Sequence, residues 1–353
     1  MNKKLTISIA SVIIAIVVLC VSLDYFRTAD PQPENTAEPA FSAVLVTQIG
    51  GLDDKSFNES AWSGLKRAEE ELGVTIQPIA SDRAADYVTN LEKATDEAPN
   101  IVWGIGFGLA QAMEATAKAN PTQKYGLVDC KLEEMPPNLV CVTFKEQEGA
   151  FLAGYLAGFQ TKTGKIGFIG GIDSPIINRF KNGYEAGAKY IAKELGKEVG
   201  VVTRYINSFD DLAKAKDVAT KMISDGCDTL FHAAGGAGRG AIEAAAELNS
   251  QVIGVDMDQH DVAPNNVIAS VVKHVDNAIF SITERIQKNE LDFYGTGLEF
   301  GLKDGGLDLI GLSEDVPAEF ITGLEKVKQK IIAGELVVPA TDEELVLFVG
   351  KNV

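Results

Sequence analysis

The fold is decided by AVLVTQIGGLDDKSFNESAWSGLKRAEEEL, residues 43–72. Residues 43–46 form an unbroken apolar run, which is typical of a parallel strand buried on both faces. The run stops at Gly50-Gly51, and Ser56 followed by Glu59 is the signature of a capping box at a helix start. Apolar residues then recur at helical spacing: Ala61, Trp62, Leu65, Ala68 and Leu72. The stretch therefore predicts a strand, a glycine turn and a helix.

Phe57 and Asn58 fall in the first turn of this predicted helix. Backbone N–H groups in a first turn have no partner inside the helix. Open α/β sheets bind their ligands just beyond the carboxyl ends of their strands. We therefore expect this turn to form one wall of a small-molecule site.

The composition indicates a globular protein with two domains. A chain of 353 residues exceeds what one core usually fills, and 46% hydrophobic with 23% charged residues is close to the average for soluble domains. The formal net charge of −18 would repel a phosphate backbone. Nucleic acid is therefore not an expected partner.

The N-terminus differs from the rest of the chain. Two lysines precede the uncharged run 5–23, so residues 1–26 are interpreted as a signal or anchor segment and 27–41 as a linker. Cys20 lies late in the run and is a candidate for lipidation, but the residue before it, Leu19, is not small. A lipid anchor and an uncleaved membrane span both remain open. Either would hold the protein outside the cytoplasm at the cell membrane.

Strand-like and helix-like segments alternate along the remaining chain in two successive series. Strands are predicted at 75–80, 100–106, 125–130 and 139–144, and then at 165–171, 199–206, 227–234, 251–256 and 267–272. The second series opens, like the first, with a strand that ends in a glycine pair. The pattern predicts an α/β protein with two doubly wound, Rossmann-like lobes and a binding site in the cleft between them.

Motifs for catalysis are missing from the sequence. The segments at 103–108 and 235–240 resemble dinucleotide fingerprints but lack the third glycine, and no P-loop, HExxH or GxSxG motif occurs. The acids at 53–54 are interpreted as solvated or capping groups. Cys130, Cys141 and Cys227 are interpreted as small buried hydrophobes, with a Cys130–Cys141 disulfide as the alternative. We expect no enzyme activity, no cofactor and no metal.

Aromatic and acidic residues near loop starts favour binding instead. Phe57, Phe107 and Phe209 each lie near a loop after a strand or at a helix start, although each taken alone is also explained by packing. Rings that close on a flat ligand contribute about 1–3 kcal/mol of stacking per base. Asp129 ends GLVD and Asp256 ends IGVD, so both hold the same place in their units. Carboxylates there suit the vicinal hydroxyls of ribose or another sugar.

A series of segments in order resembles the basic membrane protein family, whose members are exported lipoproteins and include purine-nucleoside-binding components of ABC importers. The segments are DDKSFNESAW (53–62), GFG (106–108), FKEQEGAFLAGYLAG (144–158), GKIGFIGGIDSPIINRFKNGYEAG (164–187), HAAGGAGRGA (232–241) and IGVDMDQ (253–259). The resemblance covers about residues 43–340. It implies a type I periplasmic-binding-protein fold with a three-crossing hinge. The implied N-lobe is 42–163 plus 275–301, and the implied C-lobe is 164–274 plus 302–353.

The resemblance also implies roles for single residues. Phe57 and Phe209 would sandwich the purine, Asn58 would lie beside the base, and Phe107 would line the wall. By the same resemblance, Asp129 and Asp256 would bind ribose hydroxyls, and Lys273 would support the sugar end from the hinge. Gly235 and Gly236 would let the backbone approach the ligand.

Gln48 departs from the family pattern, which commonly has an acid at this position. An ionised acid can only accept hydrogen bonds, whereas the Gln48 amide both donates and accepts, so base preference could differ here. The expected function is capture of a purine nucleoside (inosine, guanosine or adenosine) by a monomeric receptor that serves an ABC permease. The alternative is a membrane-tethered sensing or surface-interaction protein on the same fold.

Overall fold

Six parallel strands form the sheet of the first lobe. The computed structural model describes residues 41–314 and 316–353, so the predicted signal segment, Cys20 and nearly all of the predicted linker lie outside the described residues. The sheet order is β11-β5-β4-β3-β1-β2. The strands are β1 (Ser42–Thr47), β2 (Thr75–Ile79), β3 (Ile101–Ile105), β4 (Tyr125–Val128), β5 (Leu139–Phe144) and β11 (Gly297–Phe300).

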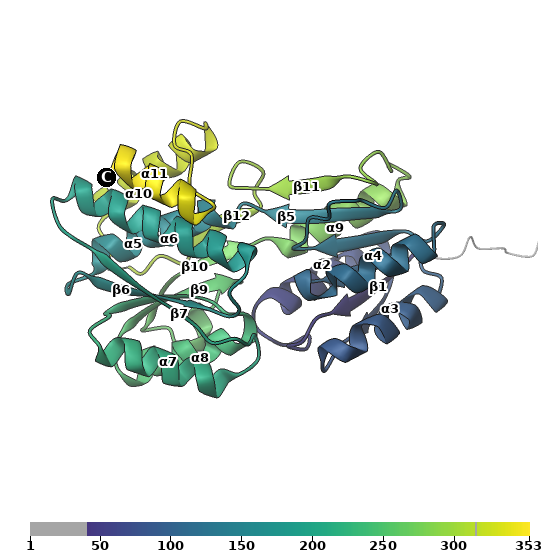
Figure 1. Cartoon of the computed structure of the whole chain (residues 1–353), viewed down its shortest axis with the longest axis horizontal. Coiled ribbons are helices and arrows are strands. Elements are labelled where there is room, and N and C mark those ends of the chain that lie inside the picture. The colour runs from purple at the N-terminus through teal and green to yellow at the C-terminus, as the bar shows by residue number, and fades with distance from the viewer. Residues whose placement is uncertain (1–40, 315) are drawn as a thin grey trace, which may run out of the picture. The chain divides into compact units, whose positions relative to one another are not determined.

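Helices cover both faces of this sheet (Figure 1). One face carries α2 (Phe57–Leu72) and α9 (Val275–Gln287), which pack on each other; the other carries α3 (Tyr87–Asp96) and α4 (Ala110–Ala119). The β1 side chains explain why its sequence is apolar throughout. Ala43 and Leu45 enter the core under α2, whereas Val44 and Val46 enter the core under α3 and α4. The predicted strand and helix of the opening stretch are both confirmed.

The second lobe repeats this plan, with the sheet order β12-β10-β9-β8-β6-β7. Its strands are β6 (Lys165–Gly170), β7 (Gly200–Tyr205), β8 (Thr229–Ala233), β9 (Gln251–Asp256), β10 (Val267–Lys273) and β12 (Leu307–Ile310). All are parallel except β12, which runs antiparallel to β10. The two-lobed α/β architecture predicted from the alternating pattern is therefore confirmed.

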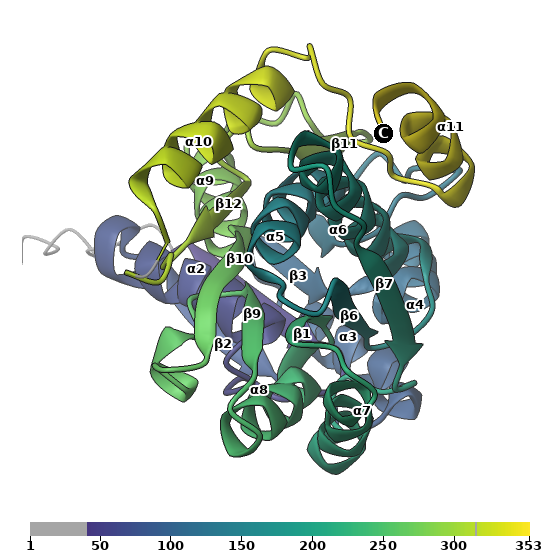
Figure 2. The same ribbon diagram turned by 90° about the vertical axis from the view of Figure 1, so that its left-hand side faces the viewer.

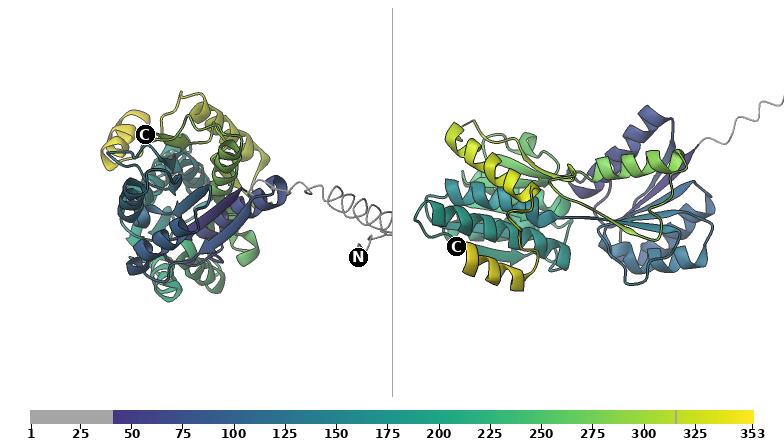
Figure 3. Two further views of the ribbon diagram at one scale, coloured as in Figure 1. Left: turned by 90° about the vertical axis from the view of Figure 1, so that its right-hand side faces the viewer. Right: turned by 90° about the horizontal axis from the view of Figure 1, so that it is seen from above.

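Figure 2 shows the helices of the second lobe on the two faces of its sheet. One face carries α5 (Glu146–Gln160) and α6 (Pro175–Glu194), and the other carries α7 (Leu212–Ser224) and α8 (Gly238–Glu247). Two further helices, α10 (Ala318–Ile332) and α11 (Asp342–Asn352), pack beside α5 and α6 (Figure 3). Among the described residues, single 3-10 turns occur at Ala84–Asp86, Phe107–Leu109, Gly235–Ala237 and His260–Val262.

The chain passes between the lobes three times, and the first crossing differs from the predicted one. Helix α5 packs against α6, β10 and β12, so the chain has already crossed at Lys145, directly after β5. The predicted boundary at 163/164 placed this helix in the first lobe. Because α5 is buried on almost all sides, its sequence pattern does not reveal which sheet it covers. The second crossing, at His274, lies within the predicted 273–276, and the third, at 301–306, overlaps the predicted 300–303.

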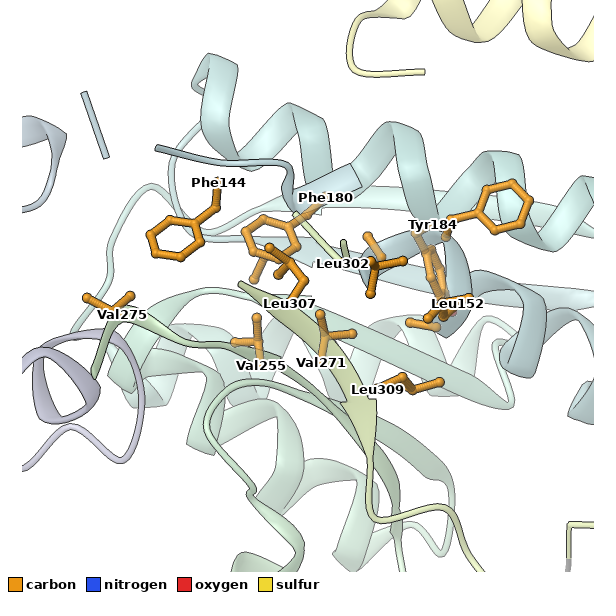
Figure 4. Close-up of a cluster of buried hydrophobic side chains, with 14 of the residues drawn as sticks. Phe144, Leu152, Phe180, Tyr184, Val255, Val271, Val275, Leu302, Leu307 and Leu309 are labelled. Atoms are coloured by element: carbon orange, nitrogen blue, oxygen red, sulfur yellow. The ribbon is translucent and has the colours of Figure 1, made fainter. Parts of the chain in front are cut away.

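The crossings are built into the hydrophobic core. Figure 4 shows Phe144, Val275 and Leu302, one residue beside or in each crossing, in one cluster with the β10 and β12 side chains Val271 and Leu309. Backbone hydrogen bonds join the crossings pairwise, from Lys145 N to Phe300 O and from His274 N to Gly306 O. The hinge is therefore a packed, hydrogen-bonded unit. Within the part of the chain that the structure describes, no helix is both long and apolar enough to cross a membrane.

Candidate functional site

A pocket lies where the carboxyl ends of the strands of both lobes face each other. The space between its lining residues that is free of protein atoms amounts to about 520 Å³, part of it open to solvent. The structure brings all ten residues predicted for binding to the lining of this one pocket: Gln48, Phe57, Asn58, Phe107, Asp129, Phe209, Gly235, Gly236, Asp256 and Lys273.

Asp129 and Asp256 occupy equivalent places in the two lobes. Asp129 directly follows β4, and Asp256 is the last residue of β9. Both adopt the left-handed conformation, with φ of 65° and 66°, respectively. Asp tolerates this conformation better than most residues with a side chain, and it ends each strand with the carboxylate at the pocket. The equivalence that GLVD and IGVD suggested thus extends to the backbone.

Lys273 is the buried cation of the pocket. Its Nζ lies 2.6 Å from both carboxylate oxygens of Asp129 and 2.9 Å from Oε1 of Glu146. The ammonium also lies 5.1 Å from the ring centroid of Phe57 and 5.0 Å from that of Phe144. Burial alone would lower the pKa of Lys273, but the carboxylates of Asp129 and Glu146 outweigh burial and raise it. Lys273 is therefore a permanent positive charge at the hinge end of the pocket.

Asp256 has a poorer set of partners than Asp129. Its Oδ2 accepts a hydrogen bond of 2.5 Å from Oγ of Ser56, and within the described chain it has no direct salt bridge. Burial raises the pKa of Asp256 to about 7, although Lys273 and the Ser56 hydroxyl act in the opposite direction. Its second oxygen accepts no hydrogen bond from the described residues, and Asp256 lines the pocket, so this oxygen is available to a hydroxyl group of a solute.

The predicted capping box at Ser56 is wrong. The Ser56 hydroxyl donates across the cleft to Asp256 and makes no cap, while the carboxylate of Asp54 accepts the backbone N–H groups of Ser56, Asn58 and Glu59. The Glu59 carboxylate accepts from the backbone N–H of Lys55, one residue before the expected donor. Asp54 thus caps the helix, as the interpretation of the acids at 53–54 allowed.

Aromatic rings from both lobes line the pocket. Phe107 of the first lobe and Phe209 of the second meet edge to face, with centroids 6.0 Å apart and an interplanar angle of 75°. Phe57 lies at the other end, beside Lys273. Gly171 makes room for Phe209, because a Cβ at this position would lie 2.3 Å from Cε1 of the Phe209 ring. Phe57 and Phe209 therefore border a shared space from opposite lobes.

Amide side chains form the end of the pocket away from the hinge. Asn58 is buried, and its Oδ1 has no hydrogen-bond partner in the described chain, while its Nδ2 faces the carbonyl of Ile49. The Gln48 side chain packs on Gly106, whose φ of 104° and missing Cβ leave room for it. These amides offer both donors and acceptors to a ligand edge.

One residue that contacts Lys273 behind the pocket and several residues that line the pocket were not predicted. Glu146 begins α5 and is fully buried, and burial raises the pKa of its carboxyl although Lys273 lowers it. Glu146 could be assigned to this region from the sequence only if α5 were placed in the second lobe. The pocket is also lined by Ile49, Asp54, Ile176, Ile177 and Phe180. Ile176 and Phe180 recur at helical spacing within α6, and such spacing alone does not show that a residue lines a pocket.

The cysteines take no part in the pocket. Cys130, Cys141 and Cys227 are all free, so the alternative of a Cys130–Cys141 disulfide is not realised. Cys141 and Cys227 are buried, as expected for small hydrophobes. Burial raises the pKa of the Cys141 thiol to about 12 and that of Cys130 to about 11, which keeps both protonated near neutral pH.

Comparison with known proteins agrees with this architecture. A family model described as "ABC transporter substrate-binding protein PnrA-like" matches residues 41–342. Basic membrane protein A1 of Borrelia garinii subsp. bavariensis is 41% identical over 323 residues, which cover 90% of this chain and 94% of that protein. Basic membrane protein B of Borreliella burgdorferi is 38% identical over 329 residues, covering 90% of this chain and 94% of that protein.

Solved structures show the same fold. A solute-binding protein of an ABC transporter system from Aeropyrum pernix K1 matches with a TM-score of 0.80 and 28% identity, covering 89% of this chain and 99% of that chain. The arabinose-binding protein AraP of Geobacillus stearothermophilus matches with a TM-score of 0.58 and 16% identity, covering 77% and 97%, so it shows the fold alone. These matches establish a type I periplasmic-binding-protein fold. The chain belongs to the PnrA-like, or basic membrane protein, family of ABC transporter substrate-binding proteins, which bind solutes and are not enzymes.

Proposed function

We propose that this protein captures purine nucleosides in the pocket between its lobes and presents them to an ABC permease. The observation that supports this most directly is the arrangement of three kinds of group around one space. Aromatic rings border it from both lobes, carboxylates and Lys273 lie at the hinge end, and the amides of Gln48 and Asn58 lie at the other.

The spacing of these groups suits a nucleoside. Gln48 follows β1 and Asp129 follows β4, and β3 alone separates these strands in the sheet. Two strand spacings are about 10 Å, which is close to the length of a base joined to a sugar. The acid end would then accept hydrogen bonds from ribose hydroxyls, the rings would cover the faces of the base, and the amides would meet its far edge.

Delivery to a permease requires that the solute favour the closed form. A ligand can shift this equilibrium only through contacts that both lobes make at once. Phe57, Asn58 and Asp129 come from the first lobe, and Phe209 and Asp256 come from the second. A nucleoside in the pocket would touch both sets and would stabilise the closed form.

The anchoring of the protein belongs to the same proposal. We propose that the protein is held at a membrane by a lipid on Cys20, and its similarity to proteins named basic membrane proteins supports this location. Mass spectrometry of the native N-terminus tests this. A lipid-modified Cys20 at the N-terminus is expected, whereas an intact Met1 would show an uncleaved span.

Calorimetry with inosine, guanosine and adenosine tests the ligand class, with uridine and ribose as comparisons. Phe209→Ala should weaken purine binding at least tenfold, because about 1.4 kcal/mol of lost stacking gives that factor. Phe159→Ala is the matched control, since Phe159 is also a partly buried phenylalanine of the second lobe but packs on Phe320 outside the pocket. No binding of any purine nucleoside at millimolar concentration would refute the proposal.

A further inference from the structure

Direct hydrogen bonds join the two lobes beside the solute pocket. The segment 54–56, which precedes α2 in the first lobe, contacts the end of β9 in the second. Ser56 Oγ donates to Asp256 Oδ2 at 2.5 Å, and Gln259 Nε2 donates to the backbone oxygen of Lys55 at 2.9 Å. Both bonds are made entirely by the protein, so neither needs a solute.

Gln259 is fixed by its own lobe. It is buried, and its Oε1 accepts from the backbone N–H of Val255 at 3.0 Å and lies 3.0 Å from Nε2 of His232. Its backbone N–H donates to Oγ of Ser270. Because Val255 N–H can only donate, the amide oxygen must face it, and the amide nitrogen must then face Lys55.

His232 supports the same orientation. Burial lowers the pKa of its imidazole to about 4, so the ring is neutral near pH 7. Since Gln259 Oε1 can only accept, Nε2 of His232 carries the ring proton. The amide nitrogen of Gln259 is thus left to donate, and it points out of its lobe to the backbone oxygen of Lys55 in the first lobe.

The first-lobe side of the contact is equally well ordered. The Asp54 carboxylate holds the segment by accepting the backbone N–H groups of Ser56, Asn58 and Glu59. Lys55 adopts φ of 55°. Gly236 of the second lobe lets this segment approach, because a Cβ there would lie 3.2 Å from the Asp54 Cβ. Both halves of the contact are therefore built before they meet.

We propose that Gln259 and Ser56 form a latch between the lobes that favours the closed form in the absence of solute. Gln259 acts as a positioning residue, because it orders the turn at Asp256 and also reaches the other lobe. A single intramolecular hydrogen bond contributes about 0.5–1.5 kcal/mol net, which corresponds to a factor of about 2–13 in the closed-to-open ratio. The latch therefore biases closure without making it irreversible.

The test measures lobe separation in the full-length protein, purified in detergent and free of added solute. Fluorescent labels on unnatural amino acids at the exposed positions Lys93 on α3 and Lys214 on α7 report the distance across the cleft and leave the native cysteines unchanged. We expect a predominant short distance in the wild type. We expect Ser56→Ala and Gln259→Met each to lower the closed-to-open ratio at least threefold.

Two matched controls separate the latch from simple loss of packing. Gln251→Met changes a glutamine at the other end of β9, whose side chain bonds only Thr229 within the second lobe. Ser63→Ala removes a serine hydroxyl from α2 away from the cleft. Neither should move the distance distribution. A role of Gln259 confined to its own lobe would lower the melting temperature and leave the distances unchanged.

The outcomes decide the proposal without knowledge of the ligand. An unliganded wild type that is fully open, or a Ser56→Ala protein with an unchanged distance distribution, would overturn the latch whether or not nucleosides bind. Failure of nucleosides to bind would overturn the proposed function and leave the latch result unaffected. If both proposals hold, the two variants should raise Kd for the nucleoside by the factor by which the closed fraction falls.

Discussion

Asp129 and Asp256 are the same residue type in the same left-handed conformation at the ends of corresponding strands, yet they differ in their partners. Asp129 is paired through both oxygens with the ammonium of Lys273. Asp256 has a serine hydroxyl instead. The comparison shows that the backbone fold shared by the two lobes determines where each carboxylate lies. Residues from distant segments determine which partner each carboxylate has.

Because their partners differ, Asp129 and Asp256 contribute differently to stability and to binding. Asp129 shares Lys273 with Glu146, so this buried charge cluster contains both signs. Asp256 lies near it without a cation of its own, and burial raises its pKa to about 7. We infer that Asp129 stabilises the hinge as well as facing the sugar, whereas Asp256 lowers stability in exchange for hydroxyl binding, a trade that functional sites often make.

Removing the shared cation should have the largest effect. Lys273→Met would leave the carboxylates of Asp129 and Glu146 buried without their ammonium partner. We expect a loss of about 3–5 kcal/mol in the free energy of unfolding, measured by urea denaturation at pH 7. Lys303→Met, at an exposed lysine, is the control and should change stability by less than about 0.5 kcal/mol. Equal effects of the two substitutions would show that the cluster does not stabilise the hinge.

Removing the paired acid should have the next largest effect. Asp129→Asn keeps the shape of the side chain and its left-handed backbone but removes the charge opposite Lys273. We expect a loss of about 2 kcal/mol in the free energy of unfolding, since hydrogen bonds to charged groups are worth about 1.5–3 kcal/mol. Asp258→Asn, at an exposed acid, is the matched control. A stability gain in Asp129→Asn would contradict the structural role of this residue.

The corresponding change at the second acid should have the smallest effect and the opposite sign. Asp256→Asn should raise the free energy of unfolding by about 1 kcal/mol at pH 8. The unfolded carboxyl ionises near pH 3.9, whereas the folded one ionises only near pH 7, so the wild type loses stability progressively as pH rises from 4 to 7. The advantage of Asp256→Asn should therefore grow over this range and level off above it.

Urea denaturation of both proteins at pH 5, 6, 7 and 8 checks this pH dependence. Calorimetry on the same samples should show weaker nucleoside binding by Asp256→Asn if the acid serves the solute. A stability difference that is constant from pH 5 to 8 would show that Asp256 ionises as easily in the folded as in the unfolded protein.

The sequence predicted the parts of this molecule that depend on periodicity and position. The apolar run at 43–46 revealed a strand with helices on both faces, and GLVD with IGVD revealed the two equivalent acids. The family resemblance then named Lys273, which no local pattern distinguishes. All of these residues lie where they were expected, because strand ends on one edge of a parallel sheet come together in every fold of this class.

The parts that were missed depend on contacts between segments far apart in the sequence. Ser56 matches a helix cap locally, but a partner 200 residues away takes its hydroxyl, and Asp54 supplies the cap. Helix α5 is apolar on nearly every side, so its sequence could not show which lobe it joins. Helix α11 was also not predicted, although Thr341 and Glu344 have the spacing of a capping box and do form one at its start.

Lys273 is the last residue of β10, and the chain crosses to the other lobe at the next residue. Its ammonium therefore lies almost on the axis about which the lobes would turn. Displacement in a rotation grows with distance from the axis. A domain rotation that moves α3 and α7 far apart therefore moves the Lys273 ammonium very little. The cleft can thus open at the side away from the hinge while the buried ion pairs of Lys273 stay intact. Each cycle of opening and closing therefore avoids the free-energy penalty of separating these charges.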